Sequence, residues 1–255
     1  MLSHRVIPTL LVDNGELVKT KQFKNPKYVG DIINVIRIFN DKEVDEIIVI
    51  DISSSKNGCD PNYLLIEELA GECFMPLTYG GGIKSIEHVE KILKLGVEKI
   101  CLHSVLFKNP GIIADIAQIY GSQTITVSLD VKKTFFGNYV VWDSVRRRKA
   151  NYTIDDFIMM AQNLGAGEIL LNNVDKDGTL SGPDLKLAEL VANKLKIPLV
   201  ASGGVASLDD MKNLIRKGAD AVAVGAYFIY HGKHRAVLVT YPNYHELSAI
   251  SQNSN

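Results

Sequence analysis

A single carboxylate stands near the end of one of the most apolar stretches of the chain. Residues 124–130 predict a buried strand, and Asp130 lies at its carboxyl end. A carboxylate in this place can act as a general acid or base, and a structural acid that caps a loop is the alternative. Residues 5–11 predict a related strand, and an offset of 119 residues (from 11 to 130) aligns Leu11 with Asp130. One of these two strands carries the acid and the other lacks it.

Two glycine-rich turns are candidates for phosphate binding. Residues 76–83 recur as residues 198–205, and each segment predicts a strand, a glycine pair and the start of a helix. Glycine lets backbone N–H groups approach an anion, which a helix amino terminus also attracts, whereas plain tight turns are the alternative. Two such sites on opposite sides of one barrel mouth fit a substrate with a phosphate at each end. The expected residues are Gly81, Gly82, His103 and Ser104 for one site, and Gly203, Gly204, Gly225 and Ala226 for the other.

Further polar residues follow the predicted strands. Asp51 ends one strand, and Asp177 and Gly178 follow another. Lys19 lies in a long first loop, from which it can reach over a phosphate as part of a lid. We expect ligand contacts from these residues, with ordinary loop polarity as the alternative.

Charges alternate at the starts of four predicted strands. Arg5, Glu46, Lys99 and Glu168 all fall at strand starts, which share the amino-terminal face of a parallel sheet. They predict a ring of ion pairs that closes the bottom of a barrel. Features of this face usually serve stability, so the residues alone favour a stabilising salt-bridge cluster.

Short apolar stretches alternate with amphipathic ones along the whole chain, which predicts an α/β fold. Eight strands close a parallel (β/α)8 TIM barrel, and the repeat predicts two duplicated half-barrels. Without a Pro-, Gly- or Ser-rich linker, we expect residues 1–255 to form one domain. The predicted strands are residues 5–11, 46–51, 75–79, 99–103, 124–130, 168–172, 199–202 and 221–225, and residues 85–93 and 208–217 predict two of the helices.

The bulk composition excludes several classes of protein. The net charge of -1 gives no general attraction to nucleic acid or to an anionic membrane, and no apolar run is long enough to span one. The three cysteines, Cys59, Cys73 and Cys101, are odd in number and lack metal-site spacing, so we expect neither a disulfide nor a metal site. We expect a cytoplasmic protein without a cofactor.

Two segments lie outside this regular alternation. Residues 135–141 and 145–150 predict a small hairpin on the rim that carries Asp130, and residues 146–149 are all basic. That basic run is either a solvated loop or a contact for an anionic substrate or an acidic partner. Residues 251–255 predict a disordered tail.

Several of these segments together resemble the cyclase subunit of imidazole glycerol phosphate synthase, the HisF family. The resemblance covers nearly the whole chain, and its most specific segments are residues 80–83, 121–123, 165–171, 175–179 and 201–204. It implies a (β/α)8 barrel that receives ammonia from a HisH-like glutaminase at its bottom. The ammonia passes up the barrel to a doubly phosphorylated ribonucleotide at the top.

The resemblance also implies roles for single residues. The family has a charged gate to its ammonia channel, and Arg5, Glu46, Lys99 and Glu168 match all four of its residues. Asp130 matches one of the two catalytic aspartates, and Lys19 and Asp51 match substrate-side positions. The departures from the family pattern are Leu11 at the second catalytic aspartate, His103 at a usual asparagine, and Ala226 at a usual serine. We therefore expect ordinary cyclisation to suffer.

A divergent subgroup resembles this chain further, through residues 55–58, 61–63, 73–77 and 234–238. Its members are second copies that accompany a glutaminase-like protein and an N-acetyl-sugar amidotransferase in surface-polysaccharide (lipopolysaccharide) gene clusters. Three functions stay open: supply of ammonia for amidination of a sugar, active cyclisation in histidine biosynthesis, and a non-catalytic scaffold that activates the glutaminase.

Overall fold

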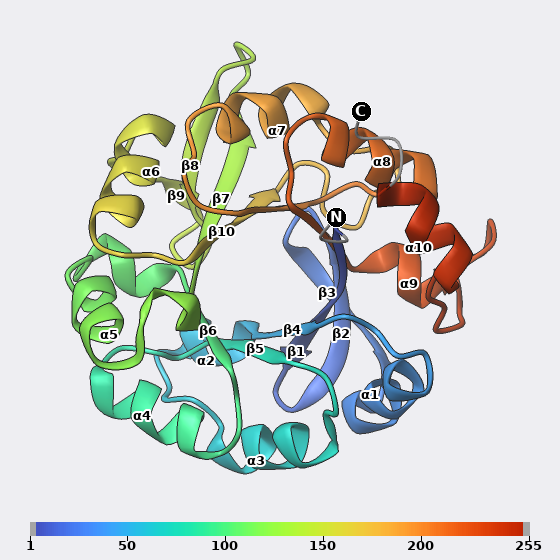
Figure 1. Ribbon diagram of the computed structural model, residues 1–255, viewed down its shortest axis with the longest axis horizontal. Helices are drawn as coiled ribbons and strands as arrows, with labels where there is room; N and C mark the ends of the chain where they lie inside the picture. The colour runs from blue at the N-terminus through green and yellow to red at the C-terminus, as the bar shows by residue number, and fades with distance from the viewer. Residues whose placement is uncertain (1–3, 252–255) are drawn as a thin grey trace.

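Eight parallel strands form a closed ring with helices around it (Figure 1). The computed structural model describes residues 4–251. The strands follow the order β10-β11-β12-β1-β4-β5-β6-β7, and pairing of β7 with β10 closes the ring. Each strand overlaps a predicted one, which confirms the (β/α)8 barrel. The strands are β1 (Arg5–Asp13), β4 (Ile47–Asp51), β5 (Leu77–Gly80), β6 (Lys99–Leu102), β7 (Ile125–Lys133), β10 (Glu168–Asn173), β11 (Leu199–Ser202) and β12 (Ala221–Val224).

Amphipathic helices cover the outside of the ring. The two predicted helices are both present, and a serine stands at the N-cap position of each, Ser85 before α4 and Ser207 before α8. The longer helices are α1 (Ile32–Asp41), α3 (Tyr63–Glu72), α4 (Ile86–Lys94), α5 (Ile112–Tyr120), α6 (Ile154–Asn163), α7 (Leu185–Ala192), α8 (Leu208–Arg216) and α10 (Tyr244–Ser251). The short elements are α2 (Ile52–Asn57), α9 (Ala226–Ile229), the 3-10 turns η1 (Ser104–Phe107) and η2 (Ser122–Thr124), and the strand pair β13 (Tyr230–His231) and β14 (Ala236–Val237).

Helix α10 also bears on the predicted tail. Ser251 is its last residue, and the remainder of the tail, residues 252–255, lies outside the described residues.

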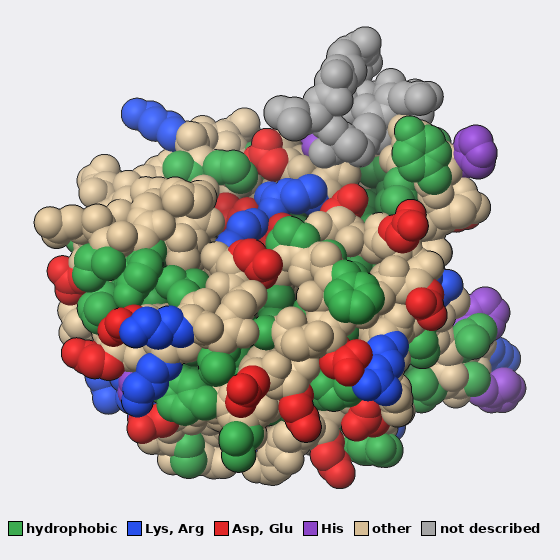
Figure 2. All heavy atoms as spheres, turned by 60° about the horizontal axis from the view of Figure 1, so that its bottom comes forward, with side chains coloured by type: hydrophobic (Ala, Val, Ile, Leu, Met, Phe, Trp, Pro, Cys, Tyr) green, Lys and Arg blue, Asp and Glu red, His purple; other side chains and the backbone are tan. Residues whose placement is uncertain are grey.

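Within residues 4–251, no helix is both long enough and apolar enough to cross a membrane. Acidic and basic side chains are interspersed over the face seen in Figure 2, as the balanced composition of 28 basic and 29 acidic residues predicts.

The strands separate two apolar cores. On β1, Val6, Leu10 and Val12 face outward and pack in the large core between the strands and the helices. Ile7 lies between them in sequence and faces inward, because side chains alternate along a strand. The inner core is a small cluster within the ring that contains Ile7, Ile48, Cys101, Leu170, Val200, Ala221 and Ala223.

The segment after β1 is a β-hairpin, so the prediction that Lys19 lies in a loop is wrong. Strands β2 (Glu16–Lys21) and β3 (Lys24–Gly30) pair antiparallel, and Leu11 of β1 stands opposite Val18 of β2. β2 continues the hydrogen bonding of β1 beyond the barrel. Lys19 therefore sits on a strand, where its position is fixed by pairing.

The predicted rim hairpin exists with shifted bounds. β7 continues to Lys133 and pairs antiparallel with β8 (Tyr139–Asp143), which pairs in turn with β9 (Arg148–Lys149). Residues 134–138 form the turn between β7 and β8, so the prediction that a strand begins at residue 135 is wrong. This excursion projects beyond the ring of helices in Figure 1.

Candidate active site

The carboxyl ends of the strands surround a cavity of about 290 Å³. Its lining includes Leu11 and residues from all eight barrel strands or the turns that follow them. Within residues 4–251, no group of three or more His, Cys, Asp or Glu side chains is placed to hold a metal ion. Every substrate-side residue predicted from the sequence lines this cavity: Asp130, Lys19, Asp51, Gly81, Gly82, His103, Ser104, Asp177, Gly178, Gly203, Gly204, Gly225 and Ala226.

Asp130 is buried, and three side chains donate hydrogen bonds to it. Its Oδ1 accepts from Ser128 Oγ and from Asn172 Nδ2, both at 2.9 Å, and its Oδ2 accepts from Ser144 Oγ. Ser128 lies two residues before Asp130 on β7 and so faces the same way, and Asn172 is the partner of Asp130 in the β7–β10 register. Donors to both oxygens fix the orientation of the carboxylate.

His103 lies beside this carboxylate. Its Nδ1 is 3.0 Å from the backbone oxygen of Ser128, and its Nε2 is 3.3 Å from Asp130 Oδ2. The edge of its ring packs against Phe107, with the ring centroids 5.1 Å apart. His103 is thus held on two sides, and an ionisable group adjoins Asp130 although Leu11 supplies none.

Lys19 reaches into the cavity from β2. Its Nζ donates to the backbone oxygen of Thr9 at 2.5 Å, and burial lowers its pKa to about 8, against the opposing pull of Asp177. A Cβ atom on Gly225 would lie 3.2 Å from this ammonium group, so glycine at that position leaves room for it. A buried cation at the mouth of a barrel suits an anionic ligand.

Asp177 joins the turn after β10 to the β2–β3 hairpin. Its Oδ2 accepts from Thr20 Oγ1 at 2.7 Å and from the backbone N–H of Phe23 at 3.2 Å. Burial raises the pKa of Asp177, although these hydrogen bonds and Lys19 act in the opposite direction. Gly178 (φ +62) packs so closely on the hairpin that a Cβ would lie 2.0 Å from Thr20 O.

Asp51 caps a helix as well as lining the cavity. It is the N-cap residue of α2, and its carboxylate accepts from the backbone N–H groups and the hydroxyls of Ser53 and Ser54 at 2.6–3.0 Å. These four hydrogen bonds account for its burial without any ligand. A substrate contact by Asp51 stays a prediction.

The two glycine turns are built alike. Gly81 has φ +126 and Gly203 has φ +107, a region that favours glycine. A Cβ on Gly81 would lie 2.4 Å from Asp51 O, and one on Gly203 would lie 2.8 Å from Asn173 O. Positions 51 and 173 are 122 residues apart, so the sequence repeat is a repeat in backbone geometry. The turns follow β5 and β11, which stand four strands apart around the barrel, on opposite sides of the cavity.

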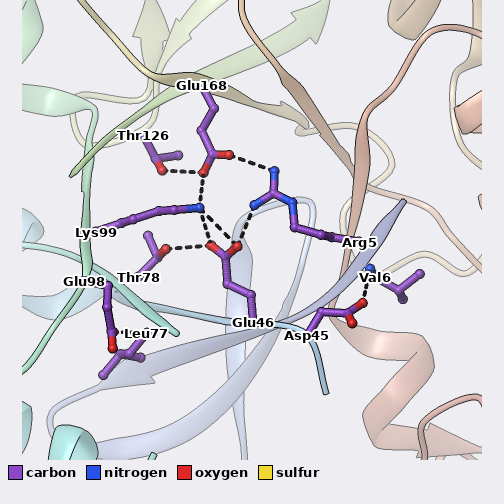
Figure 3. Close-up of polar contacts among 10 residues, drawn as sticks. All are labelled: Arg5, Val6, Asp45, Glu46, Leu77, Thr78, Glu98, Lys99, Thr126 and Glu168. Atoms are coloured by element: carbon purple, nitrogen blue, oxygen red, sulfur yellow. Dashed lines mark hydrogen bonds and ion pairs between the residues drawn. The ribbon is translucent and has the colours of Figure 1, made fainter. Parts of the chain in front are cut away.

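The four predicted bottom residues form a closed ring of ion pairs (Figure 3). Arg5 contacts Glu46 at 2.6 Å and Glu168 at 3.0 Å. Lys99 contacts the same two carboxylates at 3.1 and 3.3 Å. Burial raises the pKa of Glu168, but Lys99 and Arg5 outweigh it and hold that pKa below its usual value.

Threonine hydroxyls complete the ring. Thr78 donates to Glu46 at 2.9 Å, and Thr126 donates to Glu168 at 2.7 Å. Above them, the inner apolar cluster separates this polar ring from the polar cavity. From bottom to top, the barrel interior therefore consists of a charged ring, an uncharged layer and a cavity lined by charged residues.

Sequence reasoning missed some of these polar residues. Ser128, Thr78 and Thr126 carried a usable signal, since each lies two residues from an inward-facing position on its strand. Asn172 needed the register between β7 and β10, and Ser144 needed the fold-back of the β8–β9 turn over Asp130.

These features place the chain in a class: α/β-barrel proteins with a polar cavity at the strand ends and a charged ring at the strand starts. A family model described as "Histidine biosynthesis protein" matches residues 5–235. The chain is 46% identical to the "Putative imidazole glycerol phosphate synthase subunit hisF2" of Pseudomonas aeruginosa, over 97% of this chain and 99% of that protein. It is 45% identical to the "Putative imidazole glycerol phosphate synthase subunit hisF3" of Vibrio vulnificus, over 95% and 94%.

A third relative extends the similarity. The "Imidazole glycerol phosphate synthase subunit HisF" of Dictyoglomus thermophilum is 39% identical, over 89% of this chain and 90% of that protein. The chain belongs to the HisF family of imidazole glycerol phosphate synthase cyclase subunits.

Proposed function

We propose that this protein is an ammonia-channelling synthase subunit that works with a HisH-like glutaminase docked at the bottom of the barrel. The single observation that carries the proposal is the closed ring of Arg5, Glu46, Lys99 and Glu168. The ring lies across the strand starts, and both of its carboxylates are buried.

The interior above the ring supports this proposal. The inner cluster consists of uncharged residues, several of them small, such as Ala221 and Ala223. A neutral molecule can cross such a layer, while an ion pays a large desolvation cost. Ammonia released at the bottom would thus reach the cavity that holds Asp130.

The experiment measures glutamine hydrolysis by the partner glutaminase with and without this chain. We expect a complex and stimulated hydrolysis. Lys99→Ala should lower the fraction of ammonia that reaches the cavity, and Lys217→Ala, which removes an exposed lysine elsewhere, should not. No complex and no stimulation would reject the proposal.

We further propose that the nitrogen serves amidination of an N-acetyl sugar in surface-polysaccharide biosynthesis, with a sugar amidotransferase as a further partner. Two observations support this acceptor. Leu11 stands where the resemblance implies the second of the family's two catalytic aspartates, and the relatives from Pseudomonas and Vibrio carry the names hisF2 and hisF3, which number them as additional copies.

A second candidate function is cyclisation in histidine biosynthesis. It is favoured by Asp130 between two matching glycine turns, which suits a phosphorylated small molecule with a phosphate at each end. Complementation of a histidine auxotroph separates the two acceptors. No growth with the wild-type chain is expected for sugar amidination, whereas growth would establish cyclisation. Growth with Leu11→Asp alone would identify the missing carboxylate as the main defect. A scaffold that only activates the glutaminase would stimulate hydrolysis and bind no phosphorylated ligand.

A further inference from the structure

We infer that His103 and Asp130 share one proton and together form the acid–base unit of the cavity, in place of the second carboxylate that Leu11 does not provide. The shared proton follows from geometry alone. Its use in catalysis rests on the proposed synthase function.

The contact with Ser128 fixes the hydrogen on one ring nitrogen of His103. A backbone carbonyl oxygen can only accept a hydrogen bond, so Nδ1, which lies 3.0 Å from Ser128 O, is the N–H donor. In a neutral imidazole the other nitrogen, Nε2, then carries a lone pair.

Nε2 in turn faces an acceptor. It lies 3.3 Å from Asp130 Oδ2, is buried, and makes no well-aligned hydrogen bond with any described residue. Ser128, Asn172 and Ser144 already donate to Asp130, so both of its oxygens act as acceptors. Two facing lone pairs in a buried site repel each other, whereas a proton on Nε2 turns the pair into a charge-assisted contact. The pair therefore holds one proton, carried on His103.

Such a proton is what addition of ammonia to a carbonyl carbon requires. As the nitrogen lone pair forms the new C–N bond, the C=O electron pair moves onto oxygen. The proton on His103 Nε2 moves to Asp130, and Asp130 passes it to that oxygen in the same step. The new nitrogen carries a positive charge and returns one proton along the same path, so the pair ends as it began. Asp130 meets the substrate, and His103 is the positioning residue that stores the proton.

The His103–Asp130 pair replaces the carboxylate that is absent at position 11. Leu11 and His103 line the same cavity, and Leu11 leaves no carboxylate at the position that the repeat aligns with Asp130. The same two proton transfers serve a ketone or an amide carbonyl, so the inference holds for either acceptor in the proposed function.

The proton itself is tested by NMR of the isolated chain labelled with 15N-histidine at neutral pH. The six histidines give separate ring signals, and His103→Asn or His103→Gln identifies the relevant one. We expect both ring nitrogens of His103 to carry hydrogen, and Asp130→Asn to convert the ring to the neutral form with hydrogen on Nδ1. A neutral His103 ring in the wild-type protein would overturn the inference.

The catalytic use is tested in vitro with an ammonium salt as nitrogen source and the doubly phosphorylated ribonucleotide of the family as probe, since turnover too slow to support growth can still be measured with purified protein. General acid–base groups contribute about 10²–10⁴-fold, so His103→Asn should lower product formation by at least about 10²-fold. His231→Asn, at an exposed histidine, is the matched control. Adding Leu11→Asp to His103→Asn should restore activity, because a carboxylate again supplies the second group.

The outcomes separate this inference from the proposed function. Lost activity that Leu11→Asp does not restore would show that His103 has only a structural role. No product from the wild-type protein would overturn the catalytic use of the pair for this probe. Stimulation of the glutaminase is measured in parallel, and it depends on the bottom ring rather than on His103. The presence or absence of glutaminase stimulation therefore tests the proposed function independently of the His103–Asp130 pair.

Discussion

Glu46 and Glu168 lie 122 residues apart in the chain and bind the same two cations, Arg5 and Lys99. The two glutamates occupy equivalent positions of the half-barrel repeat, and each also accepts a hydrogen bond from a threonine. Two buried carboxylates thus face two cations in a balanced ring. The ring joins the two halves of the barrel at its bottom.

Removal of one cation should destabilise the ring. Lys99→Ala leaves Glu46 and Glu168 with Arg5 alone, and a buried carboxylate that loses a partner costs about 1–3 kcal/mol. We expect the free energy of unfolding, measured by urea titration, to fall by that amount. Lys217→Ala removes an exposed lysine 3.0 Å from Glu189 and should cost less than about 1 kcal/mol. Equal losses in the two variants would contradict the structural role of the ring.

The ring should also shape the stability at acid pH. The pKa of Glu168 in the folded state lies below its ordinary value of 4.5, because attraction to Lys99 and Arg5 outweighs the opposing effect of burial. The unfolded chain then binds the proton more readily, so this stabilisation is complete above pH 4.5 and is lost as the pH falls below it. Glu168→Gln should flatten that acid slope in urea titrations, and Glu189→Gln, at an exposed ion pair, should leave it unchanged.

Lys19 should lower stability at neutral pH. Burial brings its pKa from 10.5 to about 8, so between these values the unfolded chain binds the proton and the folded chain releases it. Stability from this group therefore rises with pH across that window. Lys19→Met should raise the free energy of unfolding at pH 7 by about 1–3 kcal/mol and abolish the rise between pH 8 and 10.5.

The same variant tests ligand binding. If Lys19 binds a phosphate, Lys19→Met should lose the increase in melting temperature that inorganic phosphate gives the wild-type protein. A variant that is more stable but still responds to phosphate would reject that role.

Two alanine variants distinguish the close packing of a glycine turn from the backbone strain that alanine causes at any glycine with positive φ. Gly204 (φ +91) leaves a Cβ only 2.5 Å from the backbone oxygen of Gly182, whereas Gly137 (φ +84) has nothing within 4 Å. Gly137→Ala adds only the backbone strain of about 1–2 kcal/mol, so Gly204→Ala should cost more. Gly204→Ala should also weaken stabilisation by inorganic phosphate in thermal unfolding, while Gly137→Ala should not. A similar phosphate response in both variants would reject an anion site at this turn.

Much of the barrel could be predicted because its signals are local. Position at a strand start marks Arg5 and Glu46, position at a strand end marks Asp130, and the glycine repeat marks turns whose backbones require glycine. These signals need no knowledge of which strands are neighbours. The bottom ring follows once the strands are parallel, because their starts share one face.

The contacts around Asp130 depend on distant parts of the chain and could not be read in this way. Ser144 reaches Asp130 only because the β8–β9 turn folds back, and His103 does so from the position directly after the neighbouring strand β6. Lys19 was misplaced because the pairing of β2 with β1 is decided by register, which short polar segments specify weakly. The bounds of the rim hairpin shifted for a similar reason, since β7 extends beyond the barrel to pair with β8.

The uncharged layer that contains Ile7, Leu170 and Val200 also bears on the protonation state in which nitrogen can cross the barrel. Ammonium has four protons, and an ion pays a large desolvation cost in an uncharged layer. The proposed transfer of ammonia therefore requires that nitrogen cross the layer with three protons and leave the fourth at the bottom of the barrel. Under that proposal, any acid that the reaction needs at the top must already be present there before the nitrogen arrives.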